Sequence, residues 1–199
     1  MRRIVVATKN AGKVAEIAAA LASLAVTVQS VGDFGNIPEP EETGTTFADN
    51  ALLKASYYAE KTGQPCLADD SGLEVDSLHG EPGVYSARYA GERATDADNN
   101  QKLLAAIAHY PSAERTARFR CVLAFCDPQG ETFTVDGTCE GMILDCLQGS
   151  GGFGYDPLFY MTPYGKTLAQ MSVAEKNAVS HRGKALAVMT DRLKVYWSC

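Results

Sequence analysis

The sequence has no long hydrophobic run and no excess of positive charge. No apolar stretch approaches the ~18 residues of a membrane-spanning helix. Its 24 acidic side chains outnumber 18 basic ones, so the formal net charge is −6. Proteins that hold duplex DNA or anionic membranes are normally basic. We therefore expect neither nucleic acid nor membrane as a partner, and phosphate groups, if bound, must meet a local cluster of cations.

Cysteine pairs with metal-ligand or redox spacing are also missing. The six cysteines include no Cys-x-x-Cys pair, and no histidine lies at zinc-ligand spacing from a cysteine pair. The N-terminal segment turns polar after four apolar residues, which is too short for the core of a signal peptide. We expect a cytoplasmic protein with reduced, buried thiols.

The composition is that of an ordinary globular protein, with 46% hydrophobic and 21% charged residues. No repeat or long linker divides the 199 residues, so we expect one domain over residues 1–199. The loops should lie at 31–45, 79–94 and 149–157. Apolar periodicity predicts an α/β protein with a mixed sheet. The expected strands are 3–7, 26–29, 66–68, 115–126 and 131–138, and the expected helices are 13–24, 47–62, 95–109, a short one after Ser172 and a last one after Ser180.

The polar turn after the first strand is a candidate phosphate site. It consists of Thr8, Lys9, Asn10, Ala11, Gly12 and Lys13. Backbone N–H groups at a helix N-terminus attract anions, and Lys13 adds a positive charge there. The segment is not a Walker A motif, because it holds a single glycine and the spacing differs. The alternative is simple N-capping by Asn10 beside an exposed Lys13.

Carboxylates in two segments are candidate metal ligands. Asp69 and Asp70 follow a short apolar stretch, and adjacent side chains at a strand end point in different directions. One can then face a metal while the other holds a loop. Magnesium often takes one or two carboxylates, with waters and phosphates completing its shell. Glu42, near the end of a long loop, can add a second ligand. The alternatives are a turn at Asp69–Gly72 and complementation of a helix dipole by Glu41 and Glu42.

A glycine-dense loop over residues 151–157 is a candidate ligand loop. Its glycines let the backbone approach a ligand closely. Phe153 and Tyr155 offer flat faces on which a base can stack, and Asp156 can accept hydrogen bonds from a base edge. The alternative is a tight loop whose aromatic rings pack in the core.

Cationic residues gather at the junction of the last two predicted helices. Lys176 is followed by Ser180, His181 and Arg182. Arg182 can donate to carbonyl or phosphate oxygens. A helix N-terminus disfavours the charged form of a histidine, so His181 should be neutral there. The alternative is that His181 only belongs to a capping region.

In this order, these segments resemble the inosine triphosphate pyrophosphatase family, and the bacterial dITP/XTP pyrophosphatases in particular. The resemblance spans nearly the whole chain, although the cysteine-rich middle and the C-terminal Trp197-Ser198-Cys199 are not part of it. The segments that carry it are Ala7–Lys13, Glu41–Gly44, Asn50–Ala55, Ala68–Leu73, Pro82–Gly91, Gly152–Pro157 and Ser180–Gly183.

The resemblance implies an elongated mixed β-sheet flanked by helices, with two lobes, a central cleft and usually a homodimer. It implies Mg²⁺-dependent hydrolysis of ITP, dITP and XTP to the monophosphate and pyrophosphate, which cleanses the nucleotide pool. A related pyrophosphatase for modified pyrimidine or m⁷G triphosphates and a non-catalytic nucleotide sensor remain alternatives.

The resemblance also implies a role for each site residue. Thr8, Lys9, Asn10, Ala11, Gly12, Lys13 and Ser71 would bind the triphosphate, with help from Lys54. Glu42 and Asp70 would hold Mg²⁺, and Asp70 would act as the general base. Base recognition would fall to Phe153, Gly154, Tyr155, Asp156, Lys176, His181 and Arg182.

Overall fold

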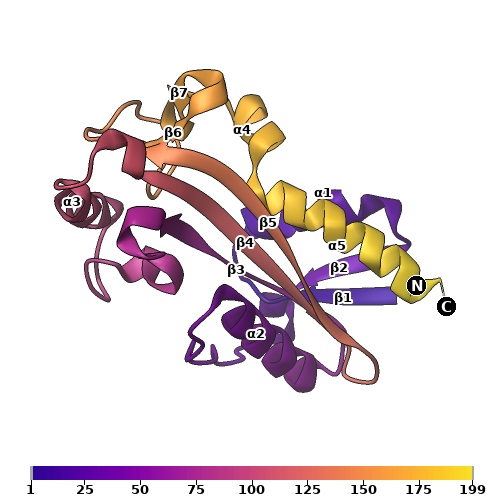
Figure 1. Cartoon of the computed structure of the whole chain (residues 1–199). Helices are drawn as coiled ribbons and strands as arrows, with labels where there is room; N and C mark the ends of the chain where they lie inside the picture. Colours follow the sequence, from indigo (N-terminus) through magenta and orange to yellow (C-terminus); the bar gives the residue numbers. More distant parts are fainter. Residues whose placement is uncertain (1, 199) are drawn as a thin grey trace. The chain divides into compact units, whose positions relative to one another are not determined.

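Seven strands form one mixed sheet in the order β2-β1-β3-β4-β5-β6-β7 (Figure 1). The computed structural model describes residues 2–198. β1 pairs in parallel with β2 and β3, whereas β6 pairs antiparallel with β5 and β7. The predicted α/β class, a mixed sheet flanked by helices, is confirmed. The strands are β1 (Arg2–Val6), β2 (Val26–Ser30), β3 (Cys66–Val75), β4 (Thr116–Cys126), β5 (Thr132–Ile143), β6 (Phe159–Met161) and β7 (Lys166–Thr167).

Polar side chains begin four of the helices. Asn10, Thr46, Thr95 and Ser172 each accept a hydrogen bond from the backbone N–H three residues on, as expected of N-cap residues. Gly63 ends the second helix in the left-handed conformation, with φ of 64°. The helices are α1 (Ala11–Ala20), α2 (Phe47–Thr62), α3 (Asp96–Ile107), α4 (Val173–Val179) and α5 (His181–Trp197).

The chain divides into two compact units, each with its own hydrophobic core. Unit 1 comprises the residues up to Asp70, Cys121–Gly137 and the residues from Arg182 on, and unit 2 comprises Ser71–Arg120 and Thr138–His181. β3, β4 and β5 therefore contribute residues to both units.

In unit 1, helices lie on both faces of the parallel strands. Ile4 of β1 and Leu67 of β3 share one buried cluster with Ile17 of α1 and Leu186 of α5. α2 covers the other face (Figure 1), where its buried residues include Ala51 and Ala55. Side chains along a strand alternate between these two faces, and this alternation determines the geometry of the candidate site.

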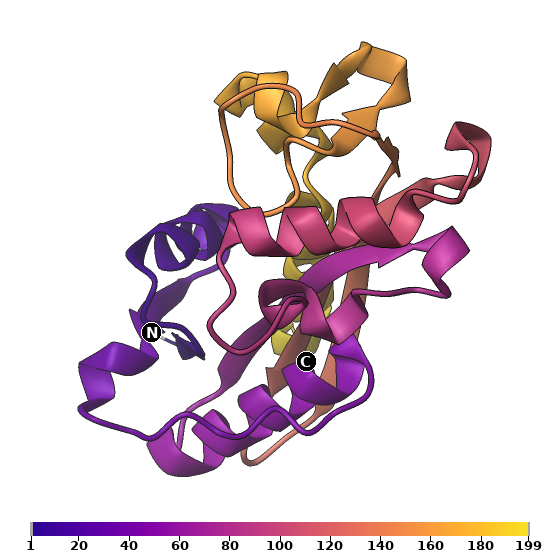
Figure 2. The same ribbon diagram turned by 90° about the vertical axis from the view of Figure 1, so that its left-hand side faces the viewer.

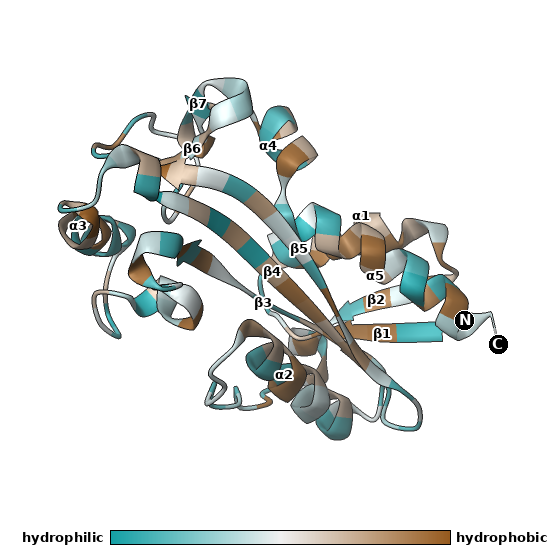
Figure 3. Cartoon of the chain, in the orientation of Figure 1, coloured by the Kyte–Doolittle hydropathy of each residue, from teal (hydrophilic) through white to brown (hydrophobic). Residues whose placement is uncertain are grey.

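In unit 2, α3 packs on the sheet through Leu103 and Ile107, which share a buried cluster with Leu73 and Ile143. Figure 2 shows α3 beside the 3-10 segment Gly83–Arg88. Figure 3 shows the alternation of apolar and polar residues along the long strands. Because Leu103 and Ile107 lie in this cluster, α3 has one apolar face on the core. Its polar N-terminal turns remain for other contacts.

Several elements differ from the sequence-based expectation. β6 and β7 were not predicted, because strands of three and two residues are too short to show alternation. β5 continues to Ile143, and α1 ends at Ala20, where a 3-10 turn over Leu21–Ser23 follows. The expected loops at 31–45 and 79–94 contain 3-10 segments at Val31–Phe34 and Gly83–Arg88.

All five described cysteines are free thiols. Four of them are buried as expected, namely Cys66, Cys121, Cys126 and Cys139, whereas Cys146 is exposed. Cys199 lies outside the described residues. Over residues 2–198, no helix has the length and hydrophobicity to cross a membrane.

Candidate active site

Asp69 and Asp70 lie inside the continuous strand β3, which corrects the expectation that they stand at a strand end. The strand persists because Leu67 and Ala68 before them and Leu73 after them are buried, so burial outweighs the turn preference of the polar segment. β1 pairs with β3 only as far as Leu67. The two carboxylates therefore follow the point where β1 ends, at the carboxyl end of parallel strands, where α/β proteins usually bind ligands.

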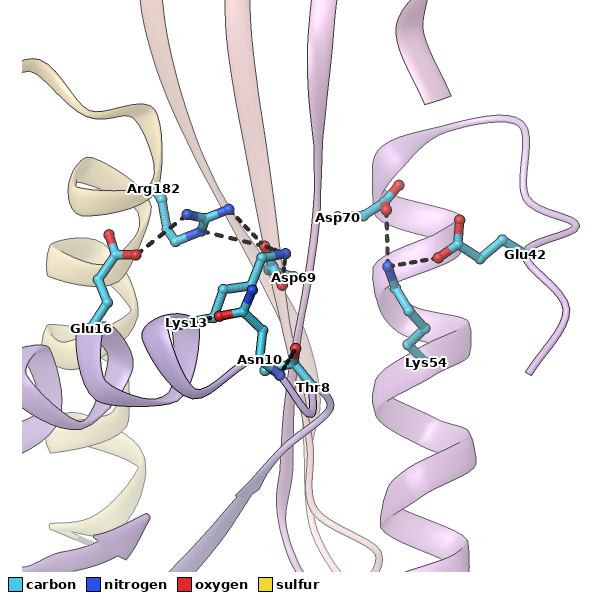
Figure 4. A network of polar contacts seen from close by, with 9 residues as sticks. All are labelled: Thr8, Asn10, Lys13, Glu16, Glu42, Lys54, Asp69, Asp70 and Arg182. Carbon is cyan, nitrogen blue, oxygen red and sulfur yellow. Dashed lines mark hydrogen bonds and ion pairs between the residues drawn. The ribbon is translucent and has the colours of Figure 1, made fainter. Parts of the chain in front are cut away.

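Asp69 points toward α1 and α5 (Figure 4). Lys13 Nζ lies 3.2 and 3.1 Å from its two oxygens, and Arg182 donates to Oδ2 from Nε at 3.3 Å and Nη2 at 3.2 Å. Arg182 Nη1 also donates to Glu16 Oε2 at 3.3 Å. Burial favours the neutral acid, yet the pKa of Asp69 is lowered because Lys13 and Arg182 outweigh burial. We name this group the Asp69 cluster: Lys13, Glu16, Asp69 and Arg182.

The turn from Thr8 to Lys13 connects the end of β1 to α1. The Asn10 N–H donates to Thr8 Oγ1, and the Lys13 N–H donates to Asn10 Oδ1, both at 3.1 Å. Ala11 and Gly12 form the first turn of α1, where backbone N–H groups lack intrahelical acceptors. Lys9 forms an exposed ion pair with Glu39 at 3.6 Å. N-capping by Asn10 is thus present, and it leaves the helix start available to an anion.

Asp70 points the opposite way, toward α2 (Figure 4). Lys54 Nζ lies 2.9 Å from Asp70 Oδ1 and 3.1 Å from Glu42 Oε1. Burial raises the pKa of Asp70, and Lys54 only partly offsets this effect. Burial would lower the pKa of Lys54, but the two carboxylates outweigh it and raise that pKa. We name this group the Asp70 cluster: Glu42, Lys54 and Asp70.

The Asp70 cluster has the donor chemistry that Mg²⁺ requires. Two carboxylates already converge on one cation, the ammonium of Lys54. Within residues 2–198, no three His, Cys, Asp or Glu side chains form a complete metal site. Mg²⁺ does not need one, because water and substrate phosphates usually complete its octahedral shell. Glu42 and Asp70 therefore fit this ion.

Ser71 follows Asp70 in β3. Its hydroxyl is buried and has no hydrogen-bond partner in the described structure. Buried hydroxyls without a partner are uncommon in folded proteins. The Ser71 hydroxyl is thus available to a ligand, consistent with its expected contact to phosphate.

The glycine-dense loop of unit 2 forms a third group around Phe153. Phe153 is 71% exposed as a residue, and Lys176 Nζ lies 4.6 Å from the centroid of its ring. Asp156 Oδ2 accepts from the Phe153 N–H at 2.9 Å and from the ammonium of Lys176. We name this group the Phe153 cluster: Phe153, Asp156 and Lys176. It combines an exposed aromatic face with a buried carboxylate, as a site for a flat, polar ring requires.

Tyr155 differs from its expected role as a stacking surface. Its side chain is part of the buried cluster of unit 2, and its hydroxyl donates to the Ser86 carbonyl at 2.7 Å. Phe153 is therefore the exposed ring of this loop. Gly154, with φ of 60°, makes the reversal that separates the outward and inward rings.

His181 and Arg182 are consecutive, but the structure gives them different surroundings. The ring of His181 stacks on Phe119, with centroids 5.3 Å apart and an interplanar angle of 15°, while Arg182 belongs to the Asp69 cluster. Sequence reasoning did not identify Glu16. The signal available was its position three residues after Lys13, which places both side chains on one side of α1.

Comparison with known proteins identifies a family that matches most of the chain. The model of the Ham1 family matches residues 4–192. A dITP/XTP pyrophosphatase of Geobacter sulfurreducens is 56% identical, over 97% of both chains. A dITP/XTP pyrophosphatase of Thermus thermophilus is 52% identical, over 96% of this chain and 92% of its own.

Solved structures show the same fold. A HAM1 protein from Coxiella burnetii superposes with a TM-score of 0.92 at 42% identity, covering 98% of this chain and 99% of its own. The Ham1 protein of Staphylococcus aureus gives 0.91 at 39% identity, covering 98% and 100%. By its sequence and by its fold, the chain belongs to the Ham1 family.

Proposed function

We propose that this protein hydrolyses non-standard purine nucleoside triphosphates, namely dITP, XTP and ITP, to the nucleoside monophosphate and pyrophosphate. The observation that carries the proposal is the pair Asp69 and Asp70, which faces two different cation groups at the carboxyl end of β1. Family relatives that are 56% and 52% identical bear the name dITP/XTP pyrophosphatase, which supports it.

The turn from Thr8 to Lys13 and the hydroxyl of Ser71 would act on the triphosphate. Lys13 and the start of α1, from Thr8 to Gly12, supply positive charge and N–H donors for phosphate oxygens, and Ser71 adds a hydroxyl. In the free protein Asp69 pairs with both Lys13 and Arg182, so an incoming phosphate competes with Asp69 for Lys13.

Glu42 and Asp70 would hold Mg²⁺. Bound Mg²⁺ supplies charge compensation for phosphate oxygens as negative charge develops on them. Asp70 takes a proton from the attacking water as general base. Burial raises the pKa of Asp70, but a general base must first lie within reach of the proton that it takes, so its placement matters before its pKa.

A second group of residues would act on the base. Phe153 offers the stacking surface, and Gly154 and Tyr155 shape its loop. Asp156, Lys176, His181 and Arg182 offer polar contacts. Hypoxanthine and xanthine carry a carbonyl at C6, where adenine carries an amine. Arg182 can donate to the oxygen but faces a donor in adenine, and an unpaired buried donor discriminates strongly.

We further propose that residues 1–199 act as one domain in a cytoplasmic homodimer. This part rests on the resemblance to the inosine triphosphate pyrophosphatases. Light scattering during gel filtration tests the assembly, and a monomer at micromolar concentration would contradict it.

The decisive assay measures pyrophosphate and phosphate release from ITP, dITP, XTP, ATP, m⁷GTP and a modified pyrimidine triphosphate, with Mg²⁺ and with chelator. We expect pyrophosphate from the first three, only with the metal. Faster turnover of the pyrimidine or m⁷G substrate would favour the related pyrophosphatase instead. Binding of ITP with no hydrolysis would favour a nucleotide sensor.

A further inference from the structure

The first turns of α3 hold the backbone of Gly154 from both sides. The Gly154 N–H donates to Asp96 Oδ2 at 2.7 Å, and the Gly154 carbonyl accepts from Asn100 Nδ2 at 2.8 Å. Asp96 and Asn100 are four residues apart, so they lie on the same side of the helix. One helix therefore takes both hydrogen-bonding groups of a single loop residue.

The amide of Asn100 is committed to this contact. Its Nδ2 also donates to the Asp96 carbonyl at 2.7 Å, so two carbonyl oxygens accept from the one amide nitrogen. The side chain is buried, with a residue exposure of 5%. Removing the amide would leave the Gly154 carbonyl, in a half-buried residue, without this donor, and a partly buried group that loses its partner is destabilised.

Gly154 is the central residue of the turn that carries the Phe153 cluster. The Asp156 N–H donates to the Phe153 carbonyl at 3.2 Å, and the Phe153 N–H donates back to Asp156 Oδ2 at 2.9 Å. Asp156 in turn pairs with Lys176, whose ammonium lies over the Phe153 ring. Fixing Gly154 thus fixes the turn, and the turn fixes the ring and the ion pair.

We propose that Asp96 and Asn100 are positioning residues for base recognition, which act by clamping Gly154 so that Phe153 and the Asp156–Lys176 pair are held ready for a purine. They act through the loop backbone and touch no substrate. The role of Asp96 and Asn100 in selecting the base rests on the proposed function. The clamp on Gly154 is a property of the protein without nucleotide.

Asp98 provides a matched control on the same helix turn. Its Oδ2 accepts from the Thr95 N–H at 2.8 Å, which completes the capping box of α3. Asp98 makes no contact with Gly154 among the hydrogen bonds of the described chain. Asp98→Asn therefore removes the same charge near the helix start without affecting the clamp.

The first measurement is hydrogen exchange by mass spectrometry on the full-length protein without nucleotide. In Asn100→Ala and Asp96→Ala we expect exchange over residues 149–157 to rise about tenfold, as expected for one lost hydrogen bond. Asp98→Asn should leave this loop unchanged. Asp96→Asn keeps an acceptor oxygen and should restore most of the protection. Unchanged exchange in both alanine variants would overturn the clamp.

The second measurement is steady-state hydrolysis of ITP and ATP by the same variants. Loss of the clamp should raise KM for ITP about tenfold, leave kcat within about twofold and lower the preference for ITP over ATP, because the loop acts on binding. A purely structural role would lower the melting temperature and the active fraction while KM stayed the same. That result would overturn the positioning role.

A third measurement separates this inference from the proposed function. If the wild-type protein hydrolyses none of the nucleotides, the proposed function fails. ITP-dependent protection of residues 149–157 then tests the clamp by itself. Protection in the wild type and in Asp98→Asn, but not in Asn100→Ala, would support it, and equal protection in all variants would overturn it. Protection in none would count against the proposed function alone, and the exchange of the nucleotide-free variants then decides the clamp.

Discussion

Asp69 and Asp70 are consecutive residues of β3, yet their carboxylates bind cations from different helices, Lys13 of α1 and Lys54 of α2. The pKa of Asp69 is lowered, because its two cations outweigh burial, whereas burial raises the pKa of Asp70. Two carboxylates whose environments shift their pKa values in opposite directions are typical of divided roles in an active site. Asp69 is suited to organise cations, and Asp70 is suited to accept a proton.

Asp70→Asn should abolish most hydrolysis while nucleotide binding persists. Asparagine keeps the size of the side chain but cannot take a proton from water, and loss of a general base typically lowers kcat about 10²- to 10⁴-fold. Pyrophosphate release and equilibrium dialysis with ITP check the two parts. Asp98→Asn, on exposed α3 surface, is the control. Retention of more than a tenth of the activity would remove Asp70 from the role of base.

Asp69→Asn should destabilise the protein at neutral pH. The change leaves Arg182 and Lys13 without their shared carboxylate, and breaking a buried pair typically costs about 3–5 kcal/mol. We expect about 3 kcal/mol, because the Lys13 side chain is 36% exposed. Urea unfolding measures the loss. Asp191→Asn breaks an exposed pair with Lys194 and should cost less than about 1 kcal/mol. If both variants lost the same free energy of unfolding, the larger stabilising effect assigned to the buried Asp69 pairs would be wrong.

Lys54→Met should strengthen metal binding by the nucleotide-free protein. Lys54 lies between Glu42 and Asp70, so its ammonium competes with a divalent cation for these carboxylates. Mn²⁺ binding, followed by electron paramagnetic resonance, should tighten at least about tenfold, which corresponds to ~1.4 kcal/mol. Lys54→Arg, which keeps the charge, is the matched control. Weaker Mn²⁺ binding in the methionine variant would show that Lys54 supports the metal site rather than competing for it.

Arg182→Ala should lower kcat/KM for ITP more than for ATP, because only ITP offers an oxygen at C6 for the guanidinium. A hydrogen bond to a charged donor is worth about 1.5–3 kcal/mol, so the ITP to ATP ratio should fall about 10- to 100-fold. Arg182→Lys keeps a charge near Asp69 and controls for stability. If both substrates lose activity equally, Arg182 acts on phosphate or only organises the Asp69 cluster.

Tyr89 should give the protein a distinct alkaline transition. Burial and a hydrogen bond to Glu81 raise the pKa of Tyr89 from 10.0 to about 12. A raised folded-state pKa means that its stabilising effect is complete below pH 10 and is lost as the pH rises toward 12. Tyr89→Phe should flatten the fall in unfolding free energy over this range. Tyr164→Phe, at an exposed site, is the control and should leave the fall in unfolding free energy unchanged. If wild type and Tyr89→Phe lost unfolding free energy equally over this pH range, the assignment to Tyr89 would be wrong.

Much of the fold could be predicted from local signals. The helices expected at 47–62, at 95–109 and after Ser172 are present as α2, α3 and α4, because apolar periodicity is a signal within a few turns of chain. The long strands β4 and β5 were predicted from alternation, because successive side chains of a strand point to opposite faces of the sheet. The path of β3 through Asp69 and Asp70 could not be predicted, because the burial of Leu67 and Leu73 that keeps the strand extended depends on segments distant in sequence.

In the candidate site, too, features that depend on residues distant in sequence could not be predicted. Composition and spacing identified the loop from Gly151 to Pro157, and a flat side chain among glycines could be expected to contact a ligand. Which of Phe153 and Tyr155 faces outward depends on the hydrogen bond from Tyr155 to Ser86 and on the clamp from α3. Such contacts join segments more than 50 residues apart, so no local pattern records them.

The exposure of Cys146, the exception among the described thiols, makes the protein convenient for spectroscopy. Among the described cysteines, Cys146 is the one accessible thiol, because the other four are buried. A Cys199→Ser substitution would remove the sixth cysteine of the sequence, so that a thiol reagent would label Cys146. The residue lies three positions before the segment 149–157. A maleimide dye attached there would report loop motion in real time, without adding a tryptophan or a tag.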